Sequence, residues 1–297
     1  MGGSILYYID QKIVIATLGP PGTYSEMAAR EYGAPLEASF DIVFASGEKC
    51  MKKLKDKEAS IAILPAENII DGIIGSTFDL LVKYCDCIKV IDEIYVKINH
   101  VLAAKIFIDS QSLREIYSHP SPFNQCSEKI SLYASNAETI PVGSTSEAAR
   151  IVSNRCDNTI GVICSLETAQ LYDLAILNHD FNNYAHNKTR FFVCGLTLAE
   201  RSDYDLTLFA VKFGNNSPGQ LFSVTQQLAT RDINLVFVHS RPSPPSFGEY
   251  VLFFELIGHY TESSIACALI NIAKLAEESG GWFTVIGSHP RRSIEAK

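Results

Sequence analysis

Residues 13–33 of this chain, IVIATLGPPGTYSEMAAREYG, decide the fold of its N-terminal part. Ile13–Leu18 is an apolar run with the length of one buried strand, and the residues after the loop favour a helix. Thr23 stands at the N-cap of that helix, Glu26 is its expected capping-box partner, and Gly33 supplies a C-terminal stop. A buried strand that leads through a loop into a capped helix predicts an α/β fold.

The same order of apolar strand, loop and helix returns three times before residue 200. We expect the later helices to begin at Ser76, at Pro122, and at a second capping box formed by Ser144 and Glu147. The helix opened by Pro122 is expected to continue to Ile130. This alternation of short strands with amphipathic helices favours an α/β domain over the first two hundred residues.

A second pattern begins near residue 203. Strands are expected at 206–213, 235–238, 250–256 and 282–286, and helices are expected from Pro218 and over 263–278. This βαββαβ order predicts a ferredoxin-like arrangement, which by itself says nothing about function.

Composition and charge argue against several classes of function. The formal net charge is -8, and the lysines and arginines form no stripe of the kind that follows a phosphate backbone, so nucleic-acid binding is not expected. No apolar run reaches the roughly eighteen residues that a bilayer requires. The first residues also lack the pattern of a signal peptide. We therefore expect a cytoplasmic protein without a membrane partner.

The eight cysteines are scattered along the chain. Only Cys85 and Cys87 lie close together, and neither a second pair nor a nearby histidine completes a zinc pattern. The loop from Gly19 to Gly22 has the spacing of neither a dinucleotide fingerprint nor a P-loop. We therefore expect reduced thiols and neither a metal nor a cofactor.

Several loops place Ser or Thr where a helix is expected to begin. Converging helix N-termini suit an anionic ligand, although Ser and Thr also cap helices for structural reasons alone. Asn68, Gln125 and the pair of Thr189 and Arg190 are residues that no cap requires. They favour a shared site, in which the planar guanidinium of Arg190 would grip a carboxylate.

Five motifs follow one another along the chain: GPPGTYS at 19–25, LPAEN at 64–68, SHPSPFNQC at 118–126, STSEAA at 144–149 and NKTRF at 187–191. As an ordered set they resemble the prephenate dehydratase family, whose members turn prephenate into phenylpyruvate on the way to phenylalanine. The resemblance implies a lyase that uses no metal or cofactor. It also implies two α/β lobes with a cleft between them, like a type 2 periplasmic-binding fold.

The resemblance also implies the domain boundaries. A catalytic domain would occupy 1–198 and an ACT regulatory domain 204–292. The change of pattern along the chain itself predicts a linker around residues 197–204. Lobe 1 would take about 1–101 and 187–198, and lobe 2 about 102–186.

The residues of the site are carried over from the family's motifs. Thr189 is expected to assist departure of the ring hydroxyl by a positioned hydrogen bond, because its own hydroxyl is a poor acid. Asn68, Ser118 and Gln125 match family residues that line the active site, and we expect them to act with Thr189. The expected substrate-binding residues are Thr23, Ser144, Thr145, Arg190 and Phe191.

The chain departs from the family's pattern beside Asn68. Ile69 replaces the customary hydroxyl residue, and Ala66 replaces an isoleucine. This leaves open an arogenate dehydratase or a prephenate decarboxylase, although decarboxylases that resemble the dehydratase lack the threonine found here at 189. A non-catalytic amino-acid sensor is an alternative from another class, and it would have no use for a leaving-group donor.

The C-terminal segment resembles an ACT domain, with which the family commonly senses phenylalanine. The two signature motifs appear as residues 219–221, GQL, and residues 239–242, HSRP, with His239 in place of an acidic residue. The resemblance implies L-phenylalanine as effector and a homodimer or homotetramer, although the module could serve assembly alone. The expected effector-binding residues are Gly219, Leu221, Asn234, Ser240 and Arg241.

Overall fold

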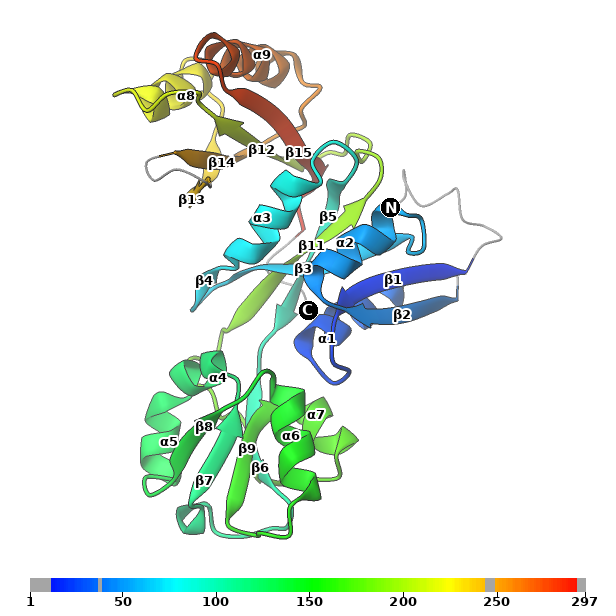
Figure 1. The fold of residues 1–297 in the computed structure, drawn as a ribbon, viewed down its shortest axis with the longest axis vertical. Coiled ribbons are helices and arrows are strands. Elements are labelled where there is room, and N and C mark those ends of the chain that lie inside the picture. Colours follow the sequence, from blue (N-terminus) through cyan, green and yellow to red (C-terminus); the bar gives the residue numbers. More distant parts are fainter. Residues whose placement is uncertain (1–11, 37–38, 244–248, 293–297) are drawn as a thin grey trace.

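The computed structural model describes residues 12–36, 39–243 and 249–292. Figure 1 shows three bodies stacked along the long axis of the molecule, which we call lobe 2 (bottom), lobe 1 (middle) and the C-terminal domain (top). The expected two-lobed α/β region followed by a third body is confirmed. Residues 1–11, which the predicted first domain includes, lie outside the described residues.

Lobe 1 is a mixed sheet in the order β5-β11-β3-β1-β2, with β4 beside β3. Helices α2 and α3 pack on one face of this sheet, and α1 packs on the other. The strands are β1 (Ile13–Leu18), β2 (Phe40–Ala45), β3 (Ile61–Asn68), β4 (Gly72–Ile73), β5 (Lys89–Lys97) and β11 (Lys188–Gly195). The helices are α1 (Tyr24–Gly33), α2 (Gly47–Lys55) and α3 (Gly75–Lys83).

Lobe 2 is built from one continuous stretch of chain between β5 and β11. Its sheet has the order β10-β6-β9-β7-β8. The strands are β6 (His100–Ala104), β7 (Glu115–Ser118), β8 (Glu138–Pro141), β9 (Ile160–Ser165) and β10 (Ala175–Asn178). The helices are α4 (Pro120–Gln125), α5 (Ser127–Tyr133), α6 (Thr145–Asn154) and α7 (Leu166–Leu171), and a 3-10 turn spans Ser110–Ser112.

The C-terminal domain has the predicted βαββαβ order. Its sheet runs β13-β14-β12-β15, and both helices pack on one side of it. The elements are β12 (Asp205–Lys212), α8 (Gln220–Ala229), β13 (Leu235–Pro242), β14 (Tyr250–Ile257), α9 (Ser263–Glu278) and β15 (Trp282–Pro290).

The sheets of lobe 1 and the C-terminal domain form one continuous ten-stranded sheet. Strand β15 pairs in parallel with β5, with Gly287 opposite Val90. A Cβ at Gly287 would lie 2.4 Å from the carbonyl oxygen of Val90, so a side chain there would force the two strands apart. The pattern of the C-terminal residues predicts the domain's own strands, but it carries no sign of this junction.

Strand β11 lies between two cores. Phe191 and Val193 pack with residues of α1, whereas Phe192 and Cys194 pack in a cluster that includes residues of the C-terminal domain. This division follows from the alternation of side chains along a strand. Consecutive residues of β11 therefore pack against different parts of the molecule.

The predicted helix starts agree with the structure at some positions and differ at others. Ser144 caps α6 as predicted, because its Oγ accepts from the backbone N–H of Glu147 (3.0 Å). The predicted helix 122–130 is instead two helices, α4 and α5, which meet at Cys126. Helix α3 begins one residue before Ser76. Helix α8 begins two residues after Pro218, because Gly219 takes a left-handed conformation (φ +88°) that is not helical, and a helix predicted to start at the proline does not allow for this.

Candidate active site

Asn68 and Thr189 meet where β3 ends and β11 begins. The two strands are antiparallel neighbours with Asn68 directly opposite Thr189, so both side chains point to the same face of the sheet. Asn68 Nδ2 donates a hydrogen bond to Thr189 Oγ1 (2.9 Å), and both residues are buried. Because the amide hydrogen occupies a lone pair of the threonine oxygen, the hydroxyl proton of Thr189 is left for another acceptor.

Asn187 extends this contact across the boundary between the lobes. Its Oδ1 accepts from Asn68 Nδ2 (2.8 Å), and its Nδ2 donates to Gln125 Oε1 (2.8 Å). Asn68 belongs to lobe 1 and Gln125 to α4 of lobe 2, so two residues predicted for the site are joined through a third. Sequence reasoning quoted Asn187 as part of its motif without assigning it a role. Its complete burial is the property that singles it out.

Asp71 is a second residue that sequence reasoning missed. Gln125 Nε2 donates to Asp71 Oδ2 (2.6 Å), and the hydroxyl of Ser121 donates to the same oxygen. The loop that carries Asp71 is held by Asn68 Oδ1, which accepts from the backbone N–H groups of Ile70 and Asp71 (both 2.9 Å). Asn68 thus fixes both the threonine hydroxyl and the carboxylate that orients Gln125.

His100 supports Gln125 from inside lobe 2. Its Nε2 lies 2.9 Å from Gln125 Oε1, and its Nδ1 lies 3.2 Å from the hydroxyl of Tyr24. An amide oxygen only accepts, so Nε2 carries the proton of the neutral ring. Burial lowers the pKa of His100 to about 4, which keeps the ring neutral near pH 7.

The N-termini of α1 and α6 lie at the same boundary. Ser146 Oγ donates to the carbonyl of Pro21 (2.5 Å), and the hydroxyl of Thr168 donates to the carbonyl of Gly22. The residues expected to bind substrate here behave differently from one another. Ser144 caps α6, and Thr145 is buried in its first turn. Thr23 occupies the predicted N-cap position of α1, but its hydroxyl makes no capping hydrogen bond. In the described part of the chain, the buried hydroxyl oxygen of Thr23 has no hydrogen-bond partner.

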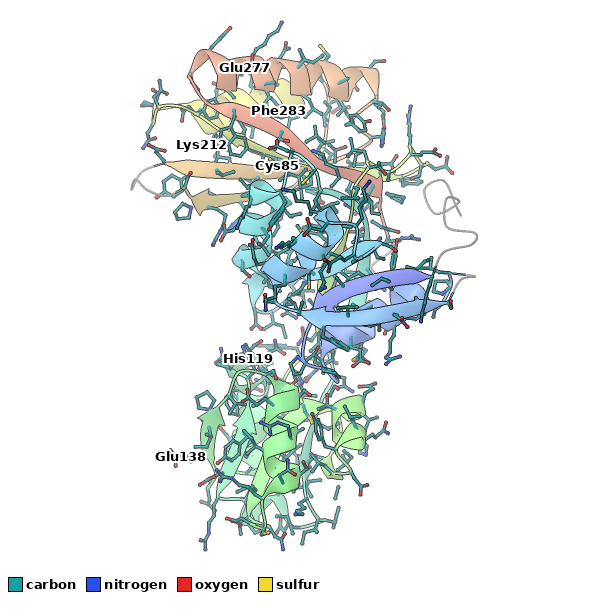
Figure 2. The ribbon with its side chains drawn as sticks, turned by 45° about the vertical axis from the view of Figure 1, so that its right-hand side comes forward. Cys85, His119, Glu138, Lys212, Glu277 and Phe283 are labelled. Atoms are coloured by element: carbon teal, nitrogen blue, oxygen red, sulfur yellow. The ribbon has the colours of Figure 1, made fainter. Side chains whose placement is uncertain are left out.

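Ser118, His119 and Phe191 are occupied elsewhere. The hydroxyl of Ser118 donates to the carbonyl of Ile163 (2.7 Å) inside lobe 2. His119, which Figure 2 shows at the end of lobe 2 nearest lobe 1, caps α4 by accepting from the backbone N–H of Ser121 (3.3 Å). Phe191 is buried in the core beside α1. None of these three side chains joins the hydrogen bonds around Thr189 that the structure records.

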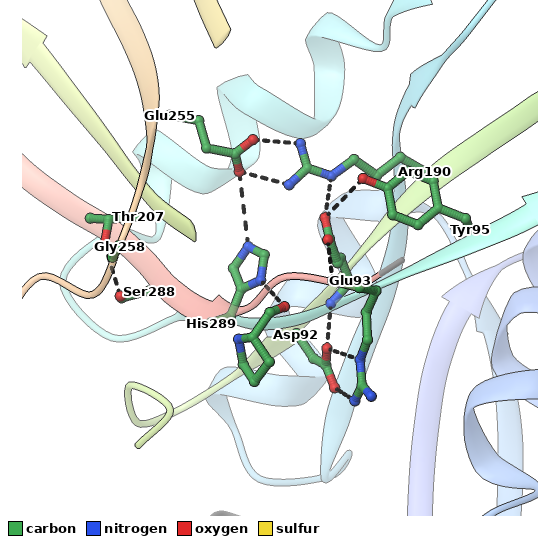
Figure 3. A network of polar contacts seen from close by, with 11 residues as sticks. Asp92, Glu93, Tyr95, Arg190, Thr207, Glu255, Gly258, Ser288 and His289 are labelled. Atoms are coloured by element: carbon green, nitrogen blue, oxygen red, sulfur yellow. Dashed lines mark hydrogen bonds and ion pairs between the residues drawn. The ribbon is translucent and has the colours of Figure 1, made fainter. Parts of the chain in front are cut away.

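The structure does not bring Arg190 to the other predicted site residues. Its Nε donates to Glu93 (2.6 Å), and its two terminal nitrogens donate to the carboxylate of Glu255 (2.8 and 2.7 Å). Figure 3 shows this pair from close by, at the junction with the C-terminal domain. Arg190 points away from Thr189 because neighbouring residues of a strand face opposite sides. A Thr-Arg dipeptide alone does not reveal which residue takes which side.

The C-terminal domain contains a hollow of about 350 Å³. Of the residues expected to bind an effector, Gly219, Leu221 and Ser240 line this hollow, whereas Asn234 and Arg241 do not. Arg241 instead pairs with Asp79 of α3 (2.5 Å). The lining of the hollow also includes a carboxylate, Glu249.

Two further properties concern residues 12–36, 39–243 and 249–292. In these ranges, no group of three or more His, Cys, Asp or Glu side chains is arranged to hold a metal ion. Over the same ranges, no helix combines the length and the apolar character needed to cross a membrane.

Comparison with known proteins gives a consistent family. A family model described as prephenate dehydratase matches residues 15–197. The prephenate dehydratase of Methanocaldococcus jannaschii is 30% identical over 283 residues, which cover 94% of this chain and 98% of that protein. A bifunctional chorismate mutase/prephenate dehydratase of Neisseria gonorrhoeae is 29% identical over 283 residues, which cover 95% of this chain and 75% of that protein.

A solved structure extends the likeness to the C-terminal domain. The prephenate dehydratase from Arthrobacter aurescens, in complex with L-Phe, matches with a TM-score of 0.84 and 25% sequence identity. The match covers 96% of this chain and 92% of that one. The two lobes and the C-terminal domain therefore have a common arrangement in the two proteins.

The lowered pKa of His100 predicts a pH dependence of stability. Between pH 6.5 and about 4 the unfolded chain binds a proton on this imidazole and the folded chain does not, so the free energy of unfolding falls as the pH falls through this window. The shift corresponds to about 3 kcal/mol over the whole window. The measurement is urea unfolding at several pH values, compared with a His100→Gln variant, in which this contribution is absent. His186→Gln, at an exposed histidine, is the matched control. Equal pH slopes for the native protein and His100→Gln would contradict the prediction.

Proposed function

The chain belongs to the prephenate dehydratase family, and we propose that it turns prephenate into phenylpyruvate in L-phenylalanine biosynthesis, by chemistry at the boundary between its two lobes. It is a lyase of the hydro-lyase class, and its substrate is a small molecule. The observation that carries the proposed site is the contact between Asn68 and Thr189, two buried polar residues that the lobes enclose together with Gln125.

Thr189 supplies the donor for the leaving group. The C–CO2⁻ bond of the substrate breaks, its electron pair enters the ring, and the ring C–OH bond breaks with its pair on oxygen, which departs as hydroxide and becomes water on protonation. Negative charge therefore develops on the departing oxygen, where a hydrogen bond from Thr189 strengthens. Asn68 already donates to Thr189 Oγ1 and so aims the threonine proton away from itself.

The two carboxylates of prephenate would meet the N-termini of α1 and α6. Their unpaired N–H groups and partial positive charge suit anions, and the loop before α1 touches α6 through Pro21 and Ser146. Thr23 adds a buried hydroxyl without a recorded partner, a group that normally requires one. Arg190 is not proposed for this binding, because its Nε and both terminal nitrogens donate to Glu93 and Glu255.

The C-terminal domain is proposed to act as an ACT regulatory module for L-phenylalanine. The hollow lined by Gly219, Leu221 and Ser240 offers apolar contact beside polar groups, as an aromatic amino acid requires. Glu249 supplies a carboxylate for the amino group, although it also pairs with Lys212 (2.7 Å). This carboxylate can take the place of the acidic residue that His239 replaces.

A homodimer or homotetramer is proposed through the same domain. Strand β13 is the outermost strand of the described sheet, and an open edge of this kind can pair with a second copy. The large apolar side chains exposed on this domain include Leu221, Phe222, Val236, Val238 and Tyr250. Apolar groups gathered near an open edge favour association between copies.

The proposed location is the cytoplasm.

The first test is turnover of prephenate at neutral pH, with the product identified by its mass and by the ultraviolet spectrum of its enolate in alkali. We expect phenylpyruvate. A product that has lost carbon dioxide but kept the hydroxyl would identify a decarboxylase and would point to Ile69, which replaces the customary hydroxyl residue beside Asn68 and is 68% exposed. Turnover of arogenate but not of prephenate would identify an arogenate dehydratase. With both substrates untouched, the sensor would be the better description.

Thr189→Ala is expected to lower kcat by roughly 10²–10³, the effect of removing one positioned donor from a developing negative charge. Thr189→Ser keeps the hydroxyl and should retain most of the activity. Thermal unfolding of both variants checks that the loss is not one of folding. Near-normal turnover in Thr189→Ala would remove Thr189 from the mechanism.

Calorimetric titration with L-phenylalanine is expected to show saturable heat. Leu221→Asp, which places a charge in the lining of the hollow without touching the lobes, should abolish it and leave turnover unchanged. No heat with the native protein would leave the domain a role in assembly alone.

A further inference from the structure

The junction between lobe 1 and the C-terminal domain is organised around Arg190. Its side chain is buried, and its guanidinium donates along two directions to two carboxylates (Figure 3). Glu93 comes from β5 of lobe 1, but Glu255 comes from β14 of the C-terminal domain and provides the two-pronged contact. The ring of Phe192 lies under the guanidinium, and its centroid is 4.8 Å from Arg190 Cζ. A carboxylate from outside the catalytic lobes is thus needed to complete the environment of a residue inside them.

Arg190 is the direct neighbour of Thr189 on β11. In the pairing with β3, Thr189 lies opposite Asn68 and Arg190 lies opposite Glu67. One pair therefore faces the candidate active site, and the next pair faces the C-terminal domain. The register of β11 against β3 shifts directly after Arg190, where β3 has one extra residue, Ala66, whereas the pairing of β11 with β5 is unbroken from Lys188 to Val193. The side-chain contacts of Arg190 therefore add to the pairing with β5 at the point where the pairing with β3 is irregular.

We propose that Glu255 of the C-terminal domain is a positioning residue for the reaction. It holds Arg190, Arg190 fixes the orientation of β11 at its start, and that orientation aims the hydroxyl of Thr189. Without the Glu255 carboxylate the guanidinium keeps Glu93 alone and can turn toward it, which shifts β11 on its β3 side, where the pairing is irregular, and moves Thr189 relative to Asn68. The inference rests on the proposed function only in naming Thr189 as the leaving-group donor.

The contacts of Glu93 explain why it cannot replace Glu255. One oxygen of Glu93 accepts from Arg190 (2.6 Å), and the other accepts from the backbone N–H of Arg292 (2.8 Å). This carboxylate is therefore fixed in place and cannot swing to cover the terminal nitrogens of Arg190. The terminal nitrogens depend on Glu255, because a buried cation needs a hydrogen-bond partner for the donors that Glu93 does not reach.

The test is Glu255→Gln, which keeps the shape of the side chain and removes its charge. Misplacement of Thr189 is expected to lower kcat roughly 10- to 100-fold, with KM changed less than about threefold, because a small displacement of a reacting group costs rate more than binding. The second readout is amide hydrogen exchange of a peptide covering residues 188–191, which should speed up as β11 loosens. The matched control is Asp79→Asn, which removes another ion pair between the same two bodies, that with Arg241, without touching β11. The control should leave both readouts at native values.

One outcome would overturn the proposal and leave Glu255 a structural residue. In that outcome Glu255→Gln has a lower melting temperature, but at temperatures well below it both kcat and the exchange of residues 188–191 have native values. The same conclusion follows if Asp79→Asn slows turnover and loosens β11 as much as Glu255→Gln does. Absence of turnover by the native protein would count against the proposed function and not against the positioning. The exchange measurement then decides alone.

Discussion

The charge of Arg190 has to be compensated where it lies, because an ionised side chain taken out of water without partners costs several kcal/mol. The structure meets this requirement with two glutamates from different bodies of the molecule, Glu93 and Glu255. The position of the C-terminal domain is therefore coupled to the position of β11. The continuous sheet and the contact of Gly287 with Val90 reinforce the same junction.

One strand serves two purposes because its side chains alternate. Thr189 turns toward Asn68 and the boundary between the lobes, and Arg190 turns toward the C-terminal domain. On the far side of the junction, β14 carries Glu255 and also Leu252, which lines the hollow proposed for phenylalanine. The contact between Arg190 of β11 and Glu255 of β14 thus links the strand that carries Thr189 to a strand that lines the hollow.

The sequence was sufficient where neighbours along the chain decide the structure. The cap at Ser144 and the βαββαβ order of the C-terminal domain follow from local patterns. The grouping of Asn68, Gln125 and Thr189, which lie far apart in the chain, came from the family resemblance of the ordered motifs, and the structure joins these residues by hydrogen bonds that include Asn187. It was insufficient where a distant partner decides. Arg190 could not be assigned to Glu255 because 65 residues separate them, and Asp71 gains its meaning only from α4. Thr23 has the sequence of a cap, yet Glu26 accepts from the N–H of Gly22 (2.6 Å) and the threonine hydroxyl is left over.

The place of β11 also sets an order of assembly on the growing chain. All strands of lobe 2 lie between His100 and Asn178, so its sheet can close as soon as that stretch has left the ribosome. Lobe 1 has to wait, because in the described sheet β3 and β5 are joined only through β11, whose residues are made about ninety positions after β5 ends. Until then β3 and β5 present unpaired edges, the kind of surface that chaperones cover. The strand that carries Thr189 is thus also the last piece that lobe 1 receives during synthesis.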